Sequence, residues 1–267
     1  MESMISAVVS GIGVRGPGLS DWSTARAVLG GQQPYSPEVL AKPTGGCLPP
    51  TERRRATVVT RLALDAASEA LGGRDPAGVT SVFASSGGEV EIIHGIFEQL
   101  AGSDRWLSPT AFHNSVHNAA AGYWSIASGS HRAADSLCAF DDSFGVGLGE
   151  ALLRLQGGDG PVLLVAYDWP PLFPTAEFRS VPQPFAAALL LNGAKSGDRV
   201  SGRLTAEYQS DRPAETPMVV PELEKLRLDN PAARALPLLS ALAAGASVEI
   251  ILGHGMAGSL RVRIDFG

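Results

Sequence analysis

The sequence is poor in cysteine, in basic charge and in long apolar runs. Its two cysteines, Cys47 and Cys138, cannot make a disulfide framework, and no Cys/His cluster has metal-site spacing, so we expect no metal site. The net charge of −6 argues against a nucleic-acid surface. No apolar run reaches about 18 residues, which argues against a membrane span.

The N-terminal stretch, MESMISAVVSGIGV, lacks the basic region that opens a signal peptide. Without such a signal or a membrane span, a cytoplasmic location is the expectation. The one basic run, residues 53–55 (RRR), opens a helical pattern, and we interpret it as a solvated or partner-facing patch.

What the sequence does contain is typical of one large folded domain. Hydrophobic residues make up 45% and charged residues 18% of the 267 residues, which allows a substantial core. The 31 glycines and 19 prolines therefore indicate many turns and not disorder. No repeat or linker is evident, so residues 1–267 are predicted to form a single domain.

Strand and helix patterns alternate along the chain, which predicts an α/β fold. Strands are predicted at residues 5–14, 79–84, 136–140, 161–167, 185–191, 202–208, 248–252 and 260–266. Helices are predicted at residues 22–29, 51–71, 89–100, 115–128, 144–155 and 232–244. We expect a mostly parallel sheet with helices on both faces. The strand at 202–208 is predicted to pair antiparallel with that at 185–191, and residues 210–230 to form a loop with no more than one helical turn.

The central feature is an abrupt turn from a strand into a helix. The predicted strand ends in the turn Phe140-Asp141-Asp142-Ser143, and the predicted helix follows from Phe144. Such an elbow aims a side chain at the space before the helix N-terminus, where backbone N–H groups and the positive end of the dipole also point. Asp141 and Asp142 are either carboxylates at a substrate pocket or an N-cap and a first-turn acid.

Other residues near the elbow are weaker candidates for chemistry. Cys138 is either a nucleophile or, as is usual within a strand, a small buried hydrophobe. His113 and His117 share one face if their segment is helical, and together with Asn114 and Asn118 they suggest a structural or pocket-lining cluster more than a metal site.

Two glycine-rich turns have the composition of anion sites. Residues 85–88 (SSGG) follow a strand and precede a helix, so they could hold an anion, but without a GxGxxG motif or a lysine a plain turn is favoured. Residues 253–258 (GHGMAG) join two strands, and we interpret them as a hairpin turn with His254 near its tip.

The segment Ser108 to Phe144 resembles the β-ketoacyl synthases of fatty-acid and polyketide synthesis. Ser108-Pro109, Asn118, Gly122, Ser125-Ile126 and Gly129 fall, without gaps, where those enzymes have SP, N, G, SI and G. Residues 253–258 look like their glycine-rich turn before the last strand. More closely, residues 48–55 (LPPTERRR) and 108–129 (SPTAFHNSVHNAAAGYWSIASG) resemble short ketosynthase-like proteins of the chain-length-factor type from aryl-polyene and related pigment pathways.

The resemblance implies a thiolase-like fold whose second half is strongly truncated. It places Asp141 at the position of the catalytic cysteine, and the two histidines of the second half have no counterpart. Decarboxylative condensation needs a thiolate and groups that polarise the malonyl carbonyl, so the resemblance implies a non-catalytic subunit without a cofactor. The other pocket residues at this elbow are Phe140, Asp142, Ser143, Phe144, His113 and His117.

The resemblance also implies a partner, an active β-ketoacyl synthase, with an acyl carrier protein as a further candidate. The elbow strand would pair antiparallel with the same strand of the partner, through Asp135, Ser136, Leu137, Cys138 and Ala139. Thr110, Ala111 and Phe112 would reach the partner's acyl tunnel and help to set product length.

Two alternatives stay open. The chain could be an independent acyltransferase or hydrolase that uses Cys138, or Asp141 with His113 or His117. It could also be a homodimer that binds acyl chains or an acyl carrier protein.

Overall fold

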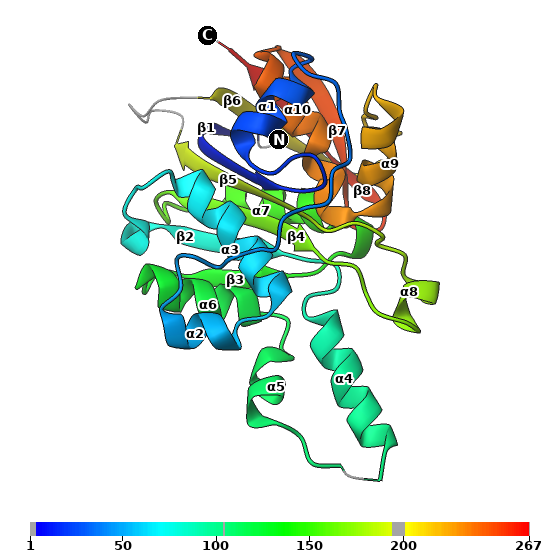
Figure 1. The fold of residues 1–267 in the computed structure, drawn as a ribbon. Coiled ribbons are helices and arrows are strands. Elements are labelled where there is room, and N and C mark those ends of the chain that lie inside the picture. Colours follow the sequence, from blue (N-terminus) through cyan, green and yellow to red (C-terminus); the bar gives the residue numbers. More distant parts are fainter. Residues whose placement is uncertain (1–3, 104, 194–200, 267) are drawn as a thin grey trace.

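The computed structural model describes residues 4–103, 105–193 and 201–266, which form one eight-stranded sheet in the order β3-β2-β4-β5-β1-β6-β8-β7 (Figure 1). The strands are β1 (Ile5–Arg15), β2 (Thr80–Ala84), β3 (Ala134–Leu137), β4 (Val162–Asp168), β5 (Phe185–Gly193), β6 (Gly202–Gln209), β7 (Val248–His254) and β8 (Gly258–Asp265). The α-helices are α1 (Trp22–Leu29), α2 (Pro50–Arg55), α3 (Val58–Leu71), α4 (Val90–Ala101), α5 (Pro109–Asn114), α6 (Ala119–Ser128), α7 (Ser143–Gln156), α8 (Thr175–Phe178), α9 (Pro221–Asp229) and α10 (Leu236–Ala244). Short 3₁₀ turns are η1 (Pro76–Gly78), η2 (Phe140–Asp142) and η3 (Pro231–Ala235).

The predicted α/β class is confirmed, but the prediction of a mostly parallel sheet is wrong. Only β2 pairs in parallel, with β3 and β4, whereas the pairs β4–β5, β5–β1, β1–β6, β6–β8 and β8–β7 are antiparallel. The predicted pairing of residues 202–208 with 185–191 is also wrong, because β1 lies between β5 and β6. Continuous apolar runs indicate burial on both faces but not strand direction.

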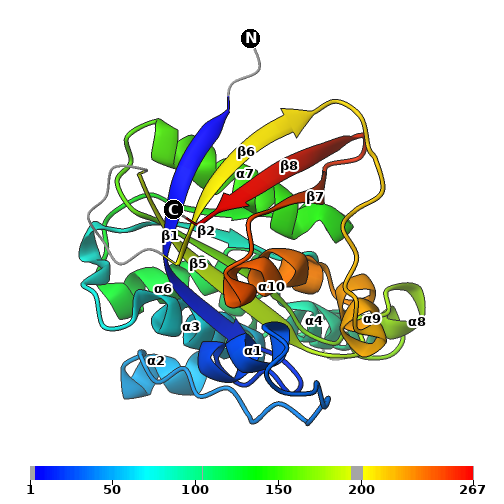
Figure 2. The ribbon, with the colours of Figure 1, turned by 90° about the horizontal axis from the view of Figure 1, so that it is seen from above.

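Helices cover both faces of the sheet, as predicted (Figure 2). On one face, α3 and α6 pack against side chains such as Phe83, Leu163 and Tyr167. On the other, α1, α7 and α10 enclose a core that includes Phe144, Leu164 and Leu189. Alternate residues of β4 and β5 therefore enter two different cores, which explains why both strands are apolar throughout.

Strand β1 approaches the backbone of α3 very closely at two glycines. A Cβ added to Gly11 would lie 1.9 Å from the Ala70 carbonyl oxygen, and one added to Gly13 would lie 2.0 Å from that of Ala66. These positions therefore admit only glycine without a backbone shift.

Local capping explains several helix boundaries, and two boundaries differ from prediction. Asp21 caps α1 through the Thr24 N–H at 2.7 Å, and Gly72 ends α3 in the left-handed conformation. The predicted helix 51–71 is two helices, because the Thr57 side chain caps a new start at α3. The predicted helix 115–128 likewise begins only at Ala119, after the separate helix α5.

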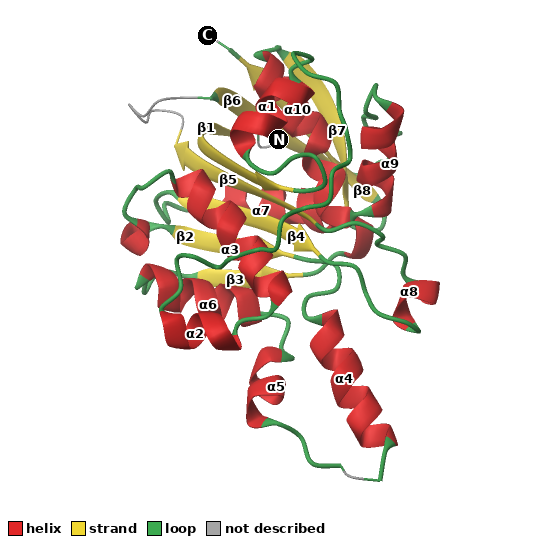
Figure 3. Cartoon of the chain, viewed as in Figure 1, coloured by secondary structure: helices red, strands yellow, loops and turns green. Residues whose placement is uncertain are grey.

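Helices α4 and α5 project from the body of the molecule as an arm (Figures 1 and 3). No residue of α4 is buried, although the helix has an apolar face, and Phe97 on it is 64% exposed. Residues 210–230, predicted as a loop, carry helix α9. None of the helices in the described part of the chain is long and apolar enough to cross a membrane.

Candidate functional site

The elbow (residues 140–143) is a tight turn between β3 and α7, and β3 ends earlier than predicted, at Leu137. Phe140 has a φ of 55°, the one non-glycine residue with positive φ in the described ranges. The Ser143 hydroxyl accepts the Ala139 N–H at 3.1 Å and donates to the Phe140 carbonyl at 2.8 Å, so it closes the turn. Phe144 is fully buried and anchors the start of α7 in the core.

Asp141, the residue at the expected nucleophile position, is held by an arginine. Its Oδ1 lies 2.7 Å from Nη2 of Arg179, and the same guanidinium sits 3.8 Å from the ring centroid of Phe140. Arg179 therefore contacts both residues of the bend, through an ion pair with the Asp141 carboxylate and over the face of the Phe140 ring.

Asp142 forms the stronger ion pair of the elbow. It is only 7% exposed, and both carboxylate oxygens accept from Arg212, at 2.5 and 2.8 Å. Arg212 also donates to the Gly255 carbonyl at 2.6 Å and lies 3.4 Å from Glu215. Through Glu215 the network continues to Arg227 at 2.9 Å.

The glycine-rich turn after β7 lies directly against this elbow. It is a hairpin turn, as predicted, because β7 ends at His254 and β8 begins at Gly258. A Cβ on Gly253 would lie 2.3 Å from Asp142 Oδ1, and a Cβ on Gly145 would lie 2.0 Å from the Gly253 carbonyl oxygen. The glycines therefore let the hairpin, the first turn of α7 and the Asp142 carboxylate meet.

The predicted histidine and cysteine candidates lie elsewhere and do not converge on Asp141. The His113 ring packs edge-on against Tyr123 at 6.2 Å, whereas His117 lies beyond the end of α5, with Nε2 3.0 Å from the Ser85 carbonyl oxygen. Cys138 follows β3 instead of lying within it, and it is exposed, with Sγ 3.3 Å from the Ser86 carbonyl oxygen. The interpretation of Cys138 as a buried strand residue is wrong, because the strand ends one residue before it.

The turn at residues 85–88 binds a carboxylate of the protein itself, that of Asp168. Asp168 Oδ1 accepts from the hydroxyls of Ser85 and Ser86 at 3.0 and 2.8 Å, and from the N–H groups of Ser86 and Gly87 at 2.9 and 3.2 Å. Its Oδ2 is buried without a partner. Burial raises the pKa of Asp168 to about 6, although these hydrogen bonds oppose the shift.

A second buried carboxylate follows the same turn. Glu89 is 2% exposed, and its Oε1 accepts from the hydroxyls of Thr57 at 2.8 Å and Thr60 at 2.7 Å. Burial raises the pKa of Glu89 as well. These two carboxylates fix the start of the arm on the body of the protein.

The residues predicted to contact a partner lie at the surface. Thr110 and Phe112 are exposed and Ala111 is half-buried, all on α5. Strand β3 is an edge of the sheet, since β2 is its sole neighbour among the described strands. Asp135 on β3 pairs with Arg154 of α7 at 2.6 Å, and Ser136 and Leu137 are half-buried.

Sequence reasoning missed four residues that organise this region, which are Asp168, Arg179, Arg212 and Glu215. Arg212 lies 70 positions from Asp142, within a segment predicted as a loop, and no local pattern links the two. The serines and glycines at 85–88 were the one signal for Asp168, since they indicated a place for an anion. In the described part of the chain, no group of three or more His, Cys, Asp or Glu residues could hold a metal ion.

Comparison with known proteins gives a consistent result. A chain of the complex between the ketosynthase ApeO and its chain length factor ApeC from Xenorhabdus doucetiae is 25% identical, with a TM-score of 0.73 over 97% of this chain and 99% of that one. A chain of the ishigamide ketosynthase/chain length factor is 13% identical, with a TM-score of 0.76 over 98% of this chain and 99% of that one.

A chain of AntDE:AntF, a type II polyketide synthase acyl-carrier protein in complex with its ketosynthase, is 14% identical, with a TM-score of 0.72 over 98% of this chain and 99% of that one. No curated protein matches this sequence. The family model for the β-ketoacyl synthase N-terminal domain matches residues 28–228, which is more than half of the chain. The thiolase-like fold is therefore confirmed, and the chain belongs to the β-ketoacyl synthase N-terminal domain family.

Proposed function

We propose that this protein is the non-catalytic partner of an active β-ketoacyl synthase and helps to set the length of the acyl or polyene chain that the partner builds. The observation that carries the proposal is the elbow itself. Where the family has its cysteine, this chain has Asp141, which is neutralised by Arg179 at 2.7 Å.

The chemistry of the elbow supports a role other than condensation. A carboxylate in an ion pair is a poor nucleophile, and the neighbouring Asp142 is tied to Arg212. Neither His113 nor His117 contacts Asp141, so no base assists it in the described structure. The resemblance to chains in ketosynthase–chain length factor complexes agrees with a subunit role.

The surface supports a protein partner at the arm and the β3 edge. Four large apolar side chains on and next to the arm are between 47% and 66% exposed, namely Phe97, Phe112, Val116 and Ile126. Apolar groups gathered in this way mark protein interfaces. The edge of β3 offers unpaired backbone groups beside them, which a strand of the partner could complete.

The length-setting role is tested by enlarging a residue on α5. Ala111→Phe adds an aromatic ring at the position proposed to face the partner's tunnel, so the reconstituted pair should make shorter products. The measurement is the chain-length distribution of products by mass spectrometry. Ala77→Phe, the same change at an exposed residue of η1, is the control and should leave the distribution unchanged. Identical distributions from Ala111→Phe and the unmodified protein would refute the role.

One observation favours a second candidate function, acyl transfer by Cys138, because its thiol is exposed. That function predicts that the isolated chain takes up an acyl group from an acyl thioester and that Cys138→Ala abolishes the uptake. If the protein is instead a subunit, neither the unmodified chain nor the Cys138→Ala variant should be stoichiometrically acylated. Intact-mass measurement detects the acyl group.

A further inference from the structure

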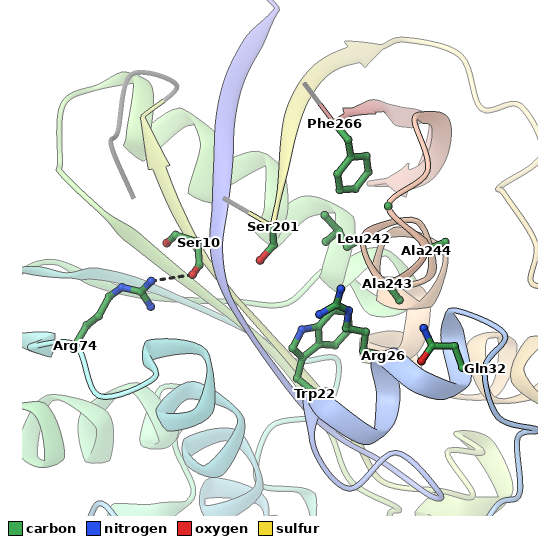
Figure 4. Close-up of a pocket in the computed structure, with 11 residues that line it drawn as sticks. Ser10, Trp22, Arg26, Gln32, Arg74, Ser201, Leu242, Ala243, Ala244 and Phe266 are labelled. Carbon is green, nitrogen blue, oxygen red and sulfur yellow. Dashed lines mark hydrogen bonds between the residues drawn. The ribbon is translucent and has the colours of Figure 1, made fainter. Parts of the chain in front are cut away.

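A cavity of about 650 Å³ lies beside β1 and the start of β6, and no elbow residue lines it. Its walls include Ser10 and Ser201 from the strand region, Trp22 and Arg26 from α1, and Arg74, with the end of α10 opposite (Figure 4). None of the described residues that line it is acidic, although the whole chain has a net charge of −6.

The cavity results from an irregularity in β1. The register against β5 shifts between Val9 and Gly11, so Ser10 is an extra residue in the strand. Among the described residues, the last pair with β6 lies at the same point, where Val9 faces Gly202 and the Ser201 N–H donates to the Val9 carbonyl at 2.7 Å. Side chains of α1 and α10 border the opening beside this point.

The polar wall around Ser10 is rigidly held. Asn192 donates to the Ser10 hydroxyl at 2.5 Å, and that hydroxyl lies 3.3 Å from the Leu190 carbonyl oxygen. Arg74 donates to the carbonyls of Ser10 at 3.0 Å and Leu71 at 3.1 Å. Arg74 is thus fixed in place by two neutral groups, and no carboxylate in the described part of the chain pairs with it.

Arg26 faces the same cavity from α1, beside the Trp22 ring (Figure 4). Within the described ranges, no carboxylate pairs with the Arg26 guanidinium, whereas several other arginines of the protein have an acidic partner. Trp22, Leu242 and Phe266 add apolar surface next to it. A cavity with two uncancelled guanidiniums and an apolar wall suits an anion that carries an apolar group.

We propose that this cavity binds a small organic phosphate ester, with its phosphate against Arg26 and its apolar part against Trp22, Leu242 and Phe266. The Gln32 amide and the Ser201 hydroxyl, which also line the cavity, can donate to the phosphate oxygens. Arg74 adds positive potential from the opposite wall. The site is independent of the elbow, so it does not rest on the proposed pairing with a ketosynthase.

The test is isothermal titration calorimetry of the full chain with 1-naphthyl phosphate, with 1-naphthol and inorganic phosphate titrated separately. The ester should bind more tightly than either fragment, and its affinity should fall with salt. Arg26→Ala should weaken binding by at least about tenfold, because it removes a charge-assisted contact. Arg26 is exposed, so this variant should fold normally, which thermal unfolding checks.

A matched pair of substitutions controls for general electrostatics. Gln32→Glu places a carboxylate in the cavity and should weaken binding of the ester. Gln33→Glu adds the same negative charge at an exposed neighbouring residue that does not line the cavity, so it should leave binding unchanged. The proposal is overturned if 1-naphthyl phosphate gives no binding heat at millimolar concentration. It is equally overturned if 1-naphthol binds as tightly, or if both glutamate variants weaken binding alike.

Discussion

At the scale of single residues, the most unusual group is a carboxylate in the core. Asp168 is 3% exposed and receives four hydrogen bonds on one oxygen from the turn at residues 85–88. Burial penalises its charged form, and the donors recover only part of that cost. Asp168 thus joins the end of β4 to the start of the arm. Because its charged form is penalised by burial, the stability of the fold depends on pH.

This predicts a measurable pH effect. Burial raises the pKa of Asp168 to about 6 in the folded protein, against about 3.9 in an unfolded chain. Between these values the folded state keeps a proton that the unfolded state has lost. The stabilisation is therefore complete below pH 4 and is lost as the pH rises through 6, by about 3 kcal/mol in total.

Urea unfolding between pH 4 and pH 7.5 measures the effect. The Asp168→Asn variant should lack this contribution, so its free energy of unfolding should fall less over that range than that of the unmodified protein. Asp211→Asn, at an exposed position, serves as the control and should keep the full dependence. Parallel pH profiles for all three proteins would contradict the assignment.

At the scale of elements, the elbow acts as a joint between α7, the β7–β8 hairpin and the segment before α9. Arg212 contacts all three, through Asp142, the Gly255 carbonyl and Glu215. The glycines at 145 and 253 bring the same elements into backbone contact. The elbow is therefore a structural connection between three elements.

Removal of Arg212 should therefore weaken the contacts between these three elements and destabilise the fold. Arg212→Ala leaves the nearly buried Asp142 carboxylate unpaired, and we expect a loss of about 2 kcal/mol in the free energy of unfolding. This is less than the roughly 3–5 kcal/mol for a fully buried pair, because Arg212 reaches solvent.

The measurement is urea unfolding at pH 7. Arg263→Ala removes an arginine from the exposed pair with Glu249 and should have no measurable effect. If the two variants unfold at the same urea concentration, the connection at the elbow does not stabilise the fold.

Local signals in the sequence predicted most elements but not their arrangement. The buried strands β2, β4 and β5, the Asp21 cap and the stop at Gly72 follow from apolar runs and cap residues, and each is confirmed within a residue or two. The place of β1 between β5 and β6 could not be predicted, because pairing partners depend on contacts far apart in sequence. The elbow was predicted as a turn, but its ion pairs to Arg179 and Arg212 were not, since no pattern marks them.

At the scale of the whole molecule, the two edges of the sheet differ. The outer edge of β7 is covered at Ile251, whose N–H and carbonyl bond to Thr216. The β3 edge has no such cover among the described residues. An uncovered edge can pair with a strand of another chain. The exposed arm lies at the same end of the sheet as β3 (Figure 1).

The β3 edge offers a selective way to block the proposed partner. The β2 N–H groups donate to the carbonyls of Ala133 and Leu137, so by alternation the backbone groups of Ser136 point outward. Ser136→Pro removes one outward N–H without loss of a bond to β2, and it should abolish the complex with the ketosynthase.

Ser136→Thr keeps the N–H and should bind as the unmodified protein does. Both variants should unfold at nearly the same temperature as the unmodified protein in differential scanning fluorimetry. Full binding by a folded Ser136→Pro variant would place the interface away from this edge.

The most direct test of the account is co-expression with an active β-ketoacyl synthase from the same organism, followed by size-exclusion chromatography with light scattering. The account predicts a stable complex that contains both chains. A well-behaved homodimer that leaves the ketosynthase unbound would contradict it.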